Sequence, residues 1–269
     1  MKKFIAMLLA LVMVIGLAAC GNKEIAPAGE TKVDTNEAMT PTTAATEAAT
    51  EAATEAATEA ATEAPAEVTV MTHADYVAAA LDSEVVIETY VQGHQSWWDN
   101  KITVYCQSPD GAYFLYELAC SEEDAAKLVP GTKIRVTGFK GEWAGEVEVM
   151  DGTFEFVEGG DTFIAEALDV TDLLTSEDLI AHQNELVAFK SMTVKAIEYK
   201  NGEPGDDIYV TLEKDGAEYN FCVEIYLTDA ESAVYTTVGE LVAGDVVDVE
   251  GFLYWYEGMN PHITGITKI

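Results

Sequence analysis

An internal duplication limits what this chain can fold into. Three short sequences recur in the same order, 101, 105 and 113 positions apart: 84–86 with 185–187, 110–112 with 215–217, and 128–139 with 241–252. The longest pair shares the pattern LVxGxxxxVxGF. Because the three matches keep their order, we interpret the region as two copies of one domain. The growing separation places insertions in loops of the second copy, the largest of them around 228–237.

Each copy predicts a short helix, three strands, a second helix and two further strands. Asp110-Gly111 and Asp215-Gly216 are typical hairpin turns, and polar caps precede the helices. In the fourth and fifth strands of the first copy, alternation turns Ile134, Val136, Val147 and Val149 toward the core. The expected strands are 85–92, 101–107 and 113–119 in the first copy and 186–199, 208–213 and 218–226 in the second, and a helix is expected over 176–183.

This order of elements is that of an OB-fold. The predicted fold class is therefore mainly β, with two tandem OB-like five-stranded barrels that carry short helices. Gly138 and Gly251 end corresponding strands, where a small barrel bends. We expect four segments: a signal peptide over 1–19, a disordered linker over 20–67, and barrels over 68–171 and 172–269.

The linker is built from Thr-Glu-Ala-Ala repeats between 46 and 64. On a helix its glutamates would stack four residues apart as like charges, and threonine weakens the helix further. We therefore expect a mobile, partly helical spacer.

The N-terminus combines two lysines, an apolar run over 4–17, and Ala18-Ala19 directly before Cys20. This arrangement resembles the lipobox of bacterial lipoproteins, and the resemblance implies a diacylglyceryl group on the Cys20 thiol. It also implies a lipid-anchored protein on the extracellular face of the cell membrane. Two alternatives stay open: an uncleaved membrane helix, for which the run is short of about 20 residues, and a free thiol after ordinary cleavage.

The two copies also resemble the tandem OB-like lipoproteins of gut-type Firmicutes. The residues that carry this resemblance are 95–98, 128–139 and 251–258. It implies an architecture and a place in the cell envelope, and it implies no activity.

The excess of acidic residues limits which partners we expect the protein to bind. The chain has 48 acidic and 14 basic residues; from Val68 onward 38 are acidic and 10 basic, and Arg135 is the single arginine. Because nucleic-acid binding depends mainly on lysine and arginine at phosphates, we expect no nucleic acid as a partner. The simpler interpretation is that the charge serves solubility.

No catalytic motif is present in the sequence. The four histidines are scattered, and Cys106, Cys120 and Cys222 form no CxxC pair, so we expect buried thiols, no cofactor, no metal and no enzyme. An acidic loop with Glu203, Asp206 and Asp207 is the one calcium candidate, and it lacks EF-hand spacing.

Six aromatic residues in loops form the candidate ligand site. Trp97 and Trp98 follow the first strand, Trp143 follows the fourth, and Tyr254, Trp255 and Tyr256 fall in the matching late loop of the second copy. These loops flank the binding face of an OB barrel. With nucleic acid excluded, we expect a glycan or peptide ligand, or a role in envelope interactions. Alternatively the aromatics plug the barrels or join them, which makes the protein an envelope scaffold or spacer, and a hydrolase is a further alternative.

A fatty-acid label tests the predicted anchor. Cells fed a clickable fatty acid should label the protein, and Cys20→Ser should abolish the label, because the thioether carries the acyl chains. In-gel fluorescence of the purified chain is the measurement. A label that persists in the serine variant contradicts the assignment.

Overall fold

The computed structural model describes residues 69–269, which contain both copies of the repeat. They belong to a single compact unit. The signal peptide, Cys20 and the linker lie outside the described residues, so those assignments stay predictions. Within 69–269, no helix is both long and apolar enough to cross a membrane.

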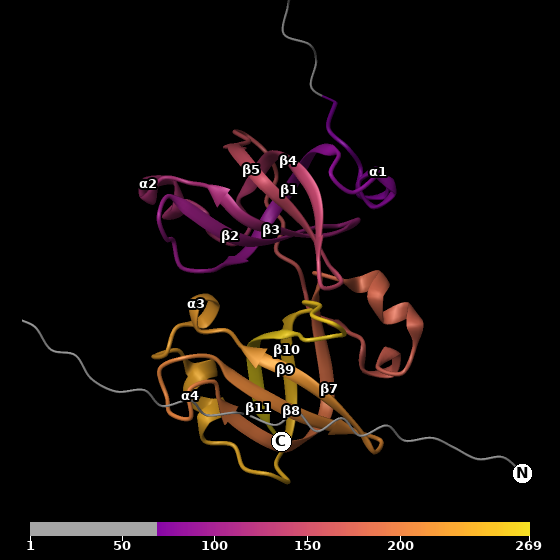
Figure 1. Ribbon diagram of the computed structural model, residues 1–269, viewed down its shortest axis with the longest axis vertical. Helices are drawn as coiled ribbons and strands as arrows, with labels where there is room; N and C mark the ends of the chain where they lie inside the picture. Colours follow the sequence, from indigo (N-terminus) through magenta and orange to yellow (C-terminus); the bar gives the residue numbers. More distant parts are fainter. Residues whose placement is uncertain (1–68) are drawn as a thin grey trace, which may run out of the picture. The chain divides into compact units, whose positions relative to one another are not determined.

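The first copy forms a closed five-stranded barrel (Figure 1). Its strands are joined in the order β1-β2-β3-β5-β4, and only the pairing of β3 with β5 is parallel. The elements are α1 (His73–Ala78), β1 (Glu84–His94), β2 (Lys101–Ser108), β3 (Gly111–Ala119), α2 (Glu122–Ala125), β4 (Lys133–Trp143) and β5 (Glu146–Phe156).

The second copy closes in the same order. A pairing of β10 with β7 completes the ring β7-β8-β9-β11-β10, β9 pairs with β11 in parallel, and β6 joins β7 from outside. The elements are β6 (Leu168–Asp169), the 3-10 helices η1 (Thr171–Leu173) and η2 (Glu177–His182), β7 (Leu186–Tyr199), β8 (Ile208–Lys214), β9 (Ala217–Val223), α3 (Ile225–Thr228), α4 (Ala233–Gly239), β10 (Val246–Phe252) and β11 (His262–Lys268). The expected fold class, two tandem OB-fold barrels, is confirmed.

Local signals account for the ends of the elements. Thr72 and Asp75 form a reciprocal capping box before α1, and the Ser121 hydroxyl accepts from the Asp124 N–H before α2. Asp215 and Gly216 both have positive φ, as the tight turn between β8 and β9 requires. Three expectations differ in detail. The helix expected over 176–183 is the 3-10 helix η2, and the strand expected over 218–226 ends at Val223 because Glu224 caps α3. Gly138, expected at the end of the fourth strand, lies inside β4.

Each barrel has its own apolar core, and a third cluster joins them. Tyr105 and Phe114 of the first barrel pack against Phe252 of the second, and the rings of Tyr105 and Phe252 stack at 4.4 Å. The Tyr105 hydroxyl lies 2.6 Å from Nδ1 of His262. Burial lowers the pKa of His262 to about 4, so the ring is neutral and can accept this hydrogen bond.

The fifth strand departs from the alternation expected of it. Val149 is buried, but Val147 is half-buried, while Glu146 and Glu148 are 0% and 5% exposed. Simple alternation places both glutamates in solvent. They are buried because second-copy residues cover this side of β5: the Trp255 N–H and the Gln183 amide both donate to the Glu146 carboxyl.

The two equivalent glycines allow backbones to meet closely. A Cβ on Gly138 would lie 2.9 Å from the Met150 carbonyl oxygen, and a Cβ on Gly251 would lie 2.3 Å from that of His262. The strand register shifts at both places. The repeated VxGF pattern therefore marks a bulge where β4 meets β5 and where β10 meets β11.

A methyl group at this bulge should destabilise the second barrel. Gly251→Ala is expected to cost about 2–3 kcal/mol, a fall in Tm of about 5–10 °C, because the new atom meets backbone that cannot rotate away. Gly265→Ala is the control, since its Cβ would make only ordinary contacts, 3.5 Å from Glu250. Equal melting temperatures for the two variants would contradict the steric explanation.

Candidate ligand-binding groove

Trp98 stands on a rigid turn and points into solvent. Its backbone N–H donates to the Lys101 carbonyl at 3.0 Å, and the Lys101 N–H donates back at 2.8 Å. The two residues between them, Asp99 and Asn100, both have positive φ, which polar side chains of this kind tolerate. The indole is 78% exposed. A large aromatic ring is therefore held out in water by an ordered backbone.

Trp97, its neighbour, faces the other way. Its indole N–H donates to the Cys120 carbonyl at 2.9 Å, and its ring packs against the core of the first barrel. Trp97 therefore anchors the loop after β1, and Trp98 presents the exposed ring.

The two tryptophans border a groove of about 440 Å³. The lining also includes Tyr226 of α3, which is 62% exposed. The N–H of Ser96 donates to the Tyr226 carbonyl at 2.7 Å and fixes this residue beside the tryptophan loop. Residues of both copies thus line one site: Gln95, Ser96, Trp97, Trp98, Lys101, Ile102, Thr103, Glu117 and Tyr226.

One ion pair belongs to the lining of the groove. The Lys101 ammonium lies 2.6 Å from a Glu117 oxygen, and this hydrogen bond raises the pKa of Lys101. Its charge is therefore already matched by a carboxylate. Asp99, in the turn that carries Trp98, adds a further negative charge. The groove offers aromatic faces and a slight excess of negative charge.

The structure divides the other predicted aromatics between two settings. Tyr254 and Trp255 are half-buried: Tyr254 stacks on His262 at 4.4 Å, and Trp255 packs against the core of the second barrel. Trp143 and Tyr256 are 62% and 51% exposed. Trp143 is the last residue of β4, and the Glu257 N–H donates to the carbonyl of the next residue, Ala144, which links the β4–β5 turn to the loop that carries Tyr256.

The six residues therefore do not form a single face. Trp97 and Trp98 share the groove with a residue that we did not single out, Tyr226. Tyr226 follows β9 at the edge of the region where the second copy carries its extra residues. The extra residues of the second copy were the one sequence signal that could have pointed to Tyr226. The position of Tyr226 beside Trp98 depends on contacts between copies that no local pattern reports.

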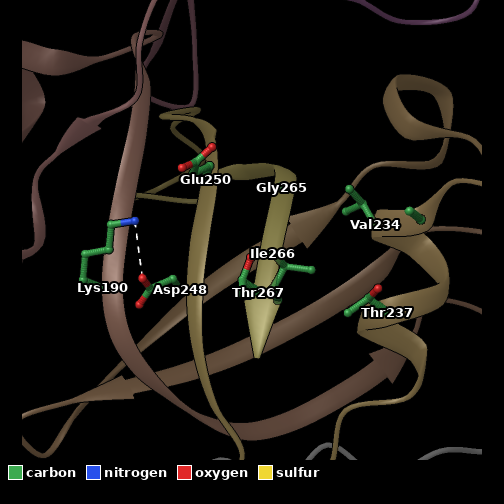
Figure 2. A pocket seen from close by; sticks show the side chains of 9 residues that line it. Lys190, Val234, Thr237, Asp248, Glu250, Gly265, Ile266 and Thr267 are labelled. Atoms are coloured by element: carbon green, nitrogen blue, oxygen red, sulfur yellow. Dashed lines mark ion pairs between the residues drawn. The ribbon is translucent and has the colours of Figure 1, made fainter. Parts of the chain in front are cut away.

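A second hollow, of about 390 Å³, lies between α4 and the sheet of the second barrel (Figure 2). Lys190 of β7 reaches toward Asp248 of β10 at 3.4 Å, with Glu250 farther along the same strand. Because Asp248 already pairs with the lysine, this hollow offers no unmatched cation for an anionic ligand.

The acidic loop considered for calcium is also occupied. The Lys200 ammonium lies 3.4 Å from Asp206 and 2.9 Å from Asp207, so a cation of the chain itself already contacts both carboxylates. Across residues 69–269, no three His, Cys, Asp or Glu side chains gather as metal ligands.

No protein-family model matches the chain, and no curated protein matches it. Comparison with solved structures finds OB-fold proteins at low similarity. A murine DNA-binding protein bound to double-stranded DNA is 10% identical, with 68% of this chain and 95% of that chain covered and a TM-score of 0.35. The p204 HINb domain is 11% identical, with 71% of this chain and 100% of that chain covered and a TM-score of 0.34. A replication protein A heterotrimer bound to single-stranded DNA is 13% identical, with 67% of this chain and 50% of that chain covered and a TM-score of 0.28.

These comparisons correct two expectations. We expected a glycan or peptide ligand for an envelope lipoprotein and excluded nucleic acid, whereas the solved structures of similar fold include proteins bound to DNA. Both expectations are wrong and are withdrawn. They rested on net charge and on the loop positions of aromatic residues. Net charge averages over a whole surface, and loop position does not fix which rings meet, so neither determines the ligand of an OB barrel.

Truncating the two neighbouring tryptophans should separate their roles. Trp97→Ala is expected to lower stability by about 3 kcal/mol, because it removes packed ring surface and a hydrogen bond. Trp98→Ala should change stability by less than about 0.5 kcal/mol, since its ring is mostly exposed. Urea denaturation of both variants is the measurement. Equal losses would mean that the Trp98 ring packs against the protein.

Proposed function

We propose that this chain is a binding protein rather than an enzyme, and that its groove takes a small organic cation such as a quaternary ammonium group. The observation that carries the proposal is the exposed Trp98 ring, which stands on an ordered turn and lines one groove together with Tyr226.

Cation–π attraction supplies the affinity. The faces of tryptophan and tyrosine rings are negative, and a cation over them gains about 0.5–1 kcal/mol when exposed and about 2 kcal/mol when desolvated. Trp98 and Tyr226 border the same groove. The turn at Asp99 and Asn100 and the Ser96 hydrogen bond fix the backbone that carries both rings, so binding has to order only the two side chains.

The charge of the protein favours the same ligand. From Val68 onward the acidic residues outnumber the basic ones by 38 to 10. This excess raises the concentration of cations near the protein as a whole, whereas selection at the groove depends on the charges beside it, and Asp99 adds a negative one there. The one ammonium in the groove, Lys101, is already paired with Glu117.

The assignment as a binding protein follows from where the reactive groups lie. The thiols of Cys106, Cys120 and Cys222 are buried, and burial raises the pKa of each, so they are poor nucleophiles. The groove has an aromatic lining and a carboxylate that is matched by a lysine. This arrangement suits ligand binding better than acid–base chemistry.

Lipid attachment at Cys20 and a location on the outer face of the cell membrane remain predictions from the sequence. They are compatible with a small-molecule binding role. They do not depend on the identity of the ligand.

The proposal is tested by titrating the chain with tetramethylammonium. The protein has four tryptophans, so a proton–nitrogen correlation spectrum gives four indole N–H signals to follow. The Trp98 and Trp97 signals should shift and saturate, and those of Trp143 and Trp255 should not. Trp98→Ala should weaken binding by about 5- to 30-fold, the loss of one cation–π contact.

Three controls decide between explanations. Trp143→Ala removes an equally exposed ring outside the groove and should leave the affinity unchanged. The neutral tert-butyl alcohol, of similar shape, should not bind, since it lacks the charge. A short single-stranded oligonucleotide forms the third arm. If it shifts the Trp98 signal and the ammonium ion does not, the groove stacks nucleic-acid bases and the cation proposal is overturned; no shift with any ligand overturns it as well.

A further inference from the structure

The junction between the two barrels contains a carboxyl group with unusual surroundings. Glu146, at the start of β5, is fully buried, and its Oε2 accepts hydrogen bonds from the Trp255 N–H at 2.8 Å and from the Gln183 amide at 3.2 Å. Both donors belong to the second copy. Glu146 therefore links the first barrel to the second.

The other oxygen of this carboxyl, Oε1, is buried without a hydrogen-bond donor among residues 69–269. The same is true of Oδ1 of Asn184, a second-copy residue that is 4% exposed. The Asn184 side chain lies beside the Glu146 carboxyl and donates its amide to the Val147 carbonyl at 3.2 Å. Each of these two oxygens is therefore a buried acceptor without a donor of its own, which is costly, and the Asn184 amide lies close enough to the carboxyl to favour its charged form.

We propose that the Glu146 carboxyl carries a proton in the folded chain, which keeps the buried junction between the two barrels uncharged, and that its loss in alkaline solution loosens the junction. One proton on Oε1 leaves Oε2 free to accept from the Trp255 N–H and the Gln183 amide. It also removes a negative charge from a site with no counter-charge.

The groups that face Glu146 do not supply a counter-charge. They are Glu148 of the same strand, Tyr76 of α1, Tyr105 of β2, and Gln183, Asn184 and Tyr254 of the second copy. Lys140, which lies over the Tyr76 ring, donates to the carbonyls of Tyr76, Val77 and Ala79. The carboxylate form of Glu146 is therefore buried among acids and neutral phenols.

Burial accordingly raises the pKa of Glu146 to about 8, above that of a free glutamate. The folded chain then holds a proton that the unfolded chain has lost. The stability that this proton provides is complete below the unfolded pKa, about 4.3, and disappears as the pH rises through about 8.

Other buried groups titrate lower. Burial raises the pKa of Glu148 and of Glu224 to about 7, and lowers that of His262 to about 4. Above pH 7.5 the His262 ring is neutral, and most of the change at the other two glutamates, which are half deprotonated at about pH 7, is complete. Glu146 should therefore dominate the pH dependence in that window.

The experiment measures Tm from pH 7.5 to pH 9 for the wild type, Glu146→Gln and Glu142→Gln. A glutamine at 146 keeps an oxygen for the Trp255 N–H and has no proton to lose. The wild type should lose about 2–4 °C, and Glu146→Gln should lose less than half as much. Glu142 is an exposed carboxylate on β4, so its replacement should reproduce the wild-type slope.

A second measurement uses the unaltered protein. The side-chain carboxyl carbons of isotopically labelled glutamates are followed by NMR, and one should titrate near pH 8 and be absent in Glu146→Gln. The radius of gyration from X-ray scattering should increase from pH 7.5 to pH 9 in the wild type alone. A glutamate signal that titrates below pH 5, or equal slopes for the wild type and Glu146→Gln, would overturn the proposal.

Discussion

The burial of one side of β5 beneath second-copy residues is the constraint on which the rest of this structure depends. An isolated first barrel would leave Glu146 and Glu148 in water on an ordinary alternating strand. In the pair, the Trp255 N–H and the Gln183 amide reach Glu146, and Tyr105, Phe114 and Phe252 close an apolar cluster nearby. The junction therefore combines aromatic stacking with a buried polar network that must be fully satisfied to be stable.

The candidate groove is a consequence of the same packing. Trp97 and Trp98 come from the loop after the first strand of one copy, and Tyr226 comes from a helix that follows the third strand of the other. The Ser96 N–H reaches the Tyr226 carbonyl across this boundary. Neither copy holds both rings by itself, so the duplication does more than repeat a fold: it brings two different loops to one site.

Local sequence predicted much of the fold. The Asp215-Gly216 turn, the Thr72 capping box and the β7 strand over Leu186–Tyr199 lie where the residues indicated, because turns, caps and periodicity are set by nearest neighbours. The repeated VxGF pattern marked the same bulge in both barrels. The site was less predictable. Trp97 and Trp98, adjacent in sequence, differ in exposure because only one finds a core and a carbonyl partner.

The sequence by itself determined that this protein is a pair of OB-fold barrels with a strongly acidic surface, because strand periodicity, turn chemistry and charge are properties of short segments and of composition. The tertiary structure alone decided which rings share a groove and which carboxyl is buried. Those outcomes depend on contacts between residues more than a hundred positions apart, such as Glu146 with Trp255 and Ser96 with Tyr226. Such contacts cannot be predicted from sequence periodicity, because the segment around each partner has the same local pattern that it would have in an isolated barrel.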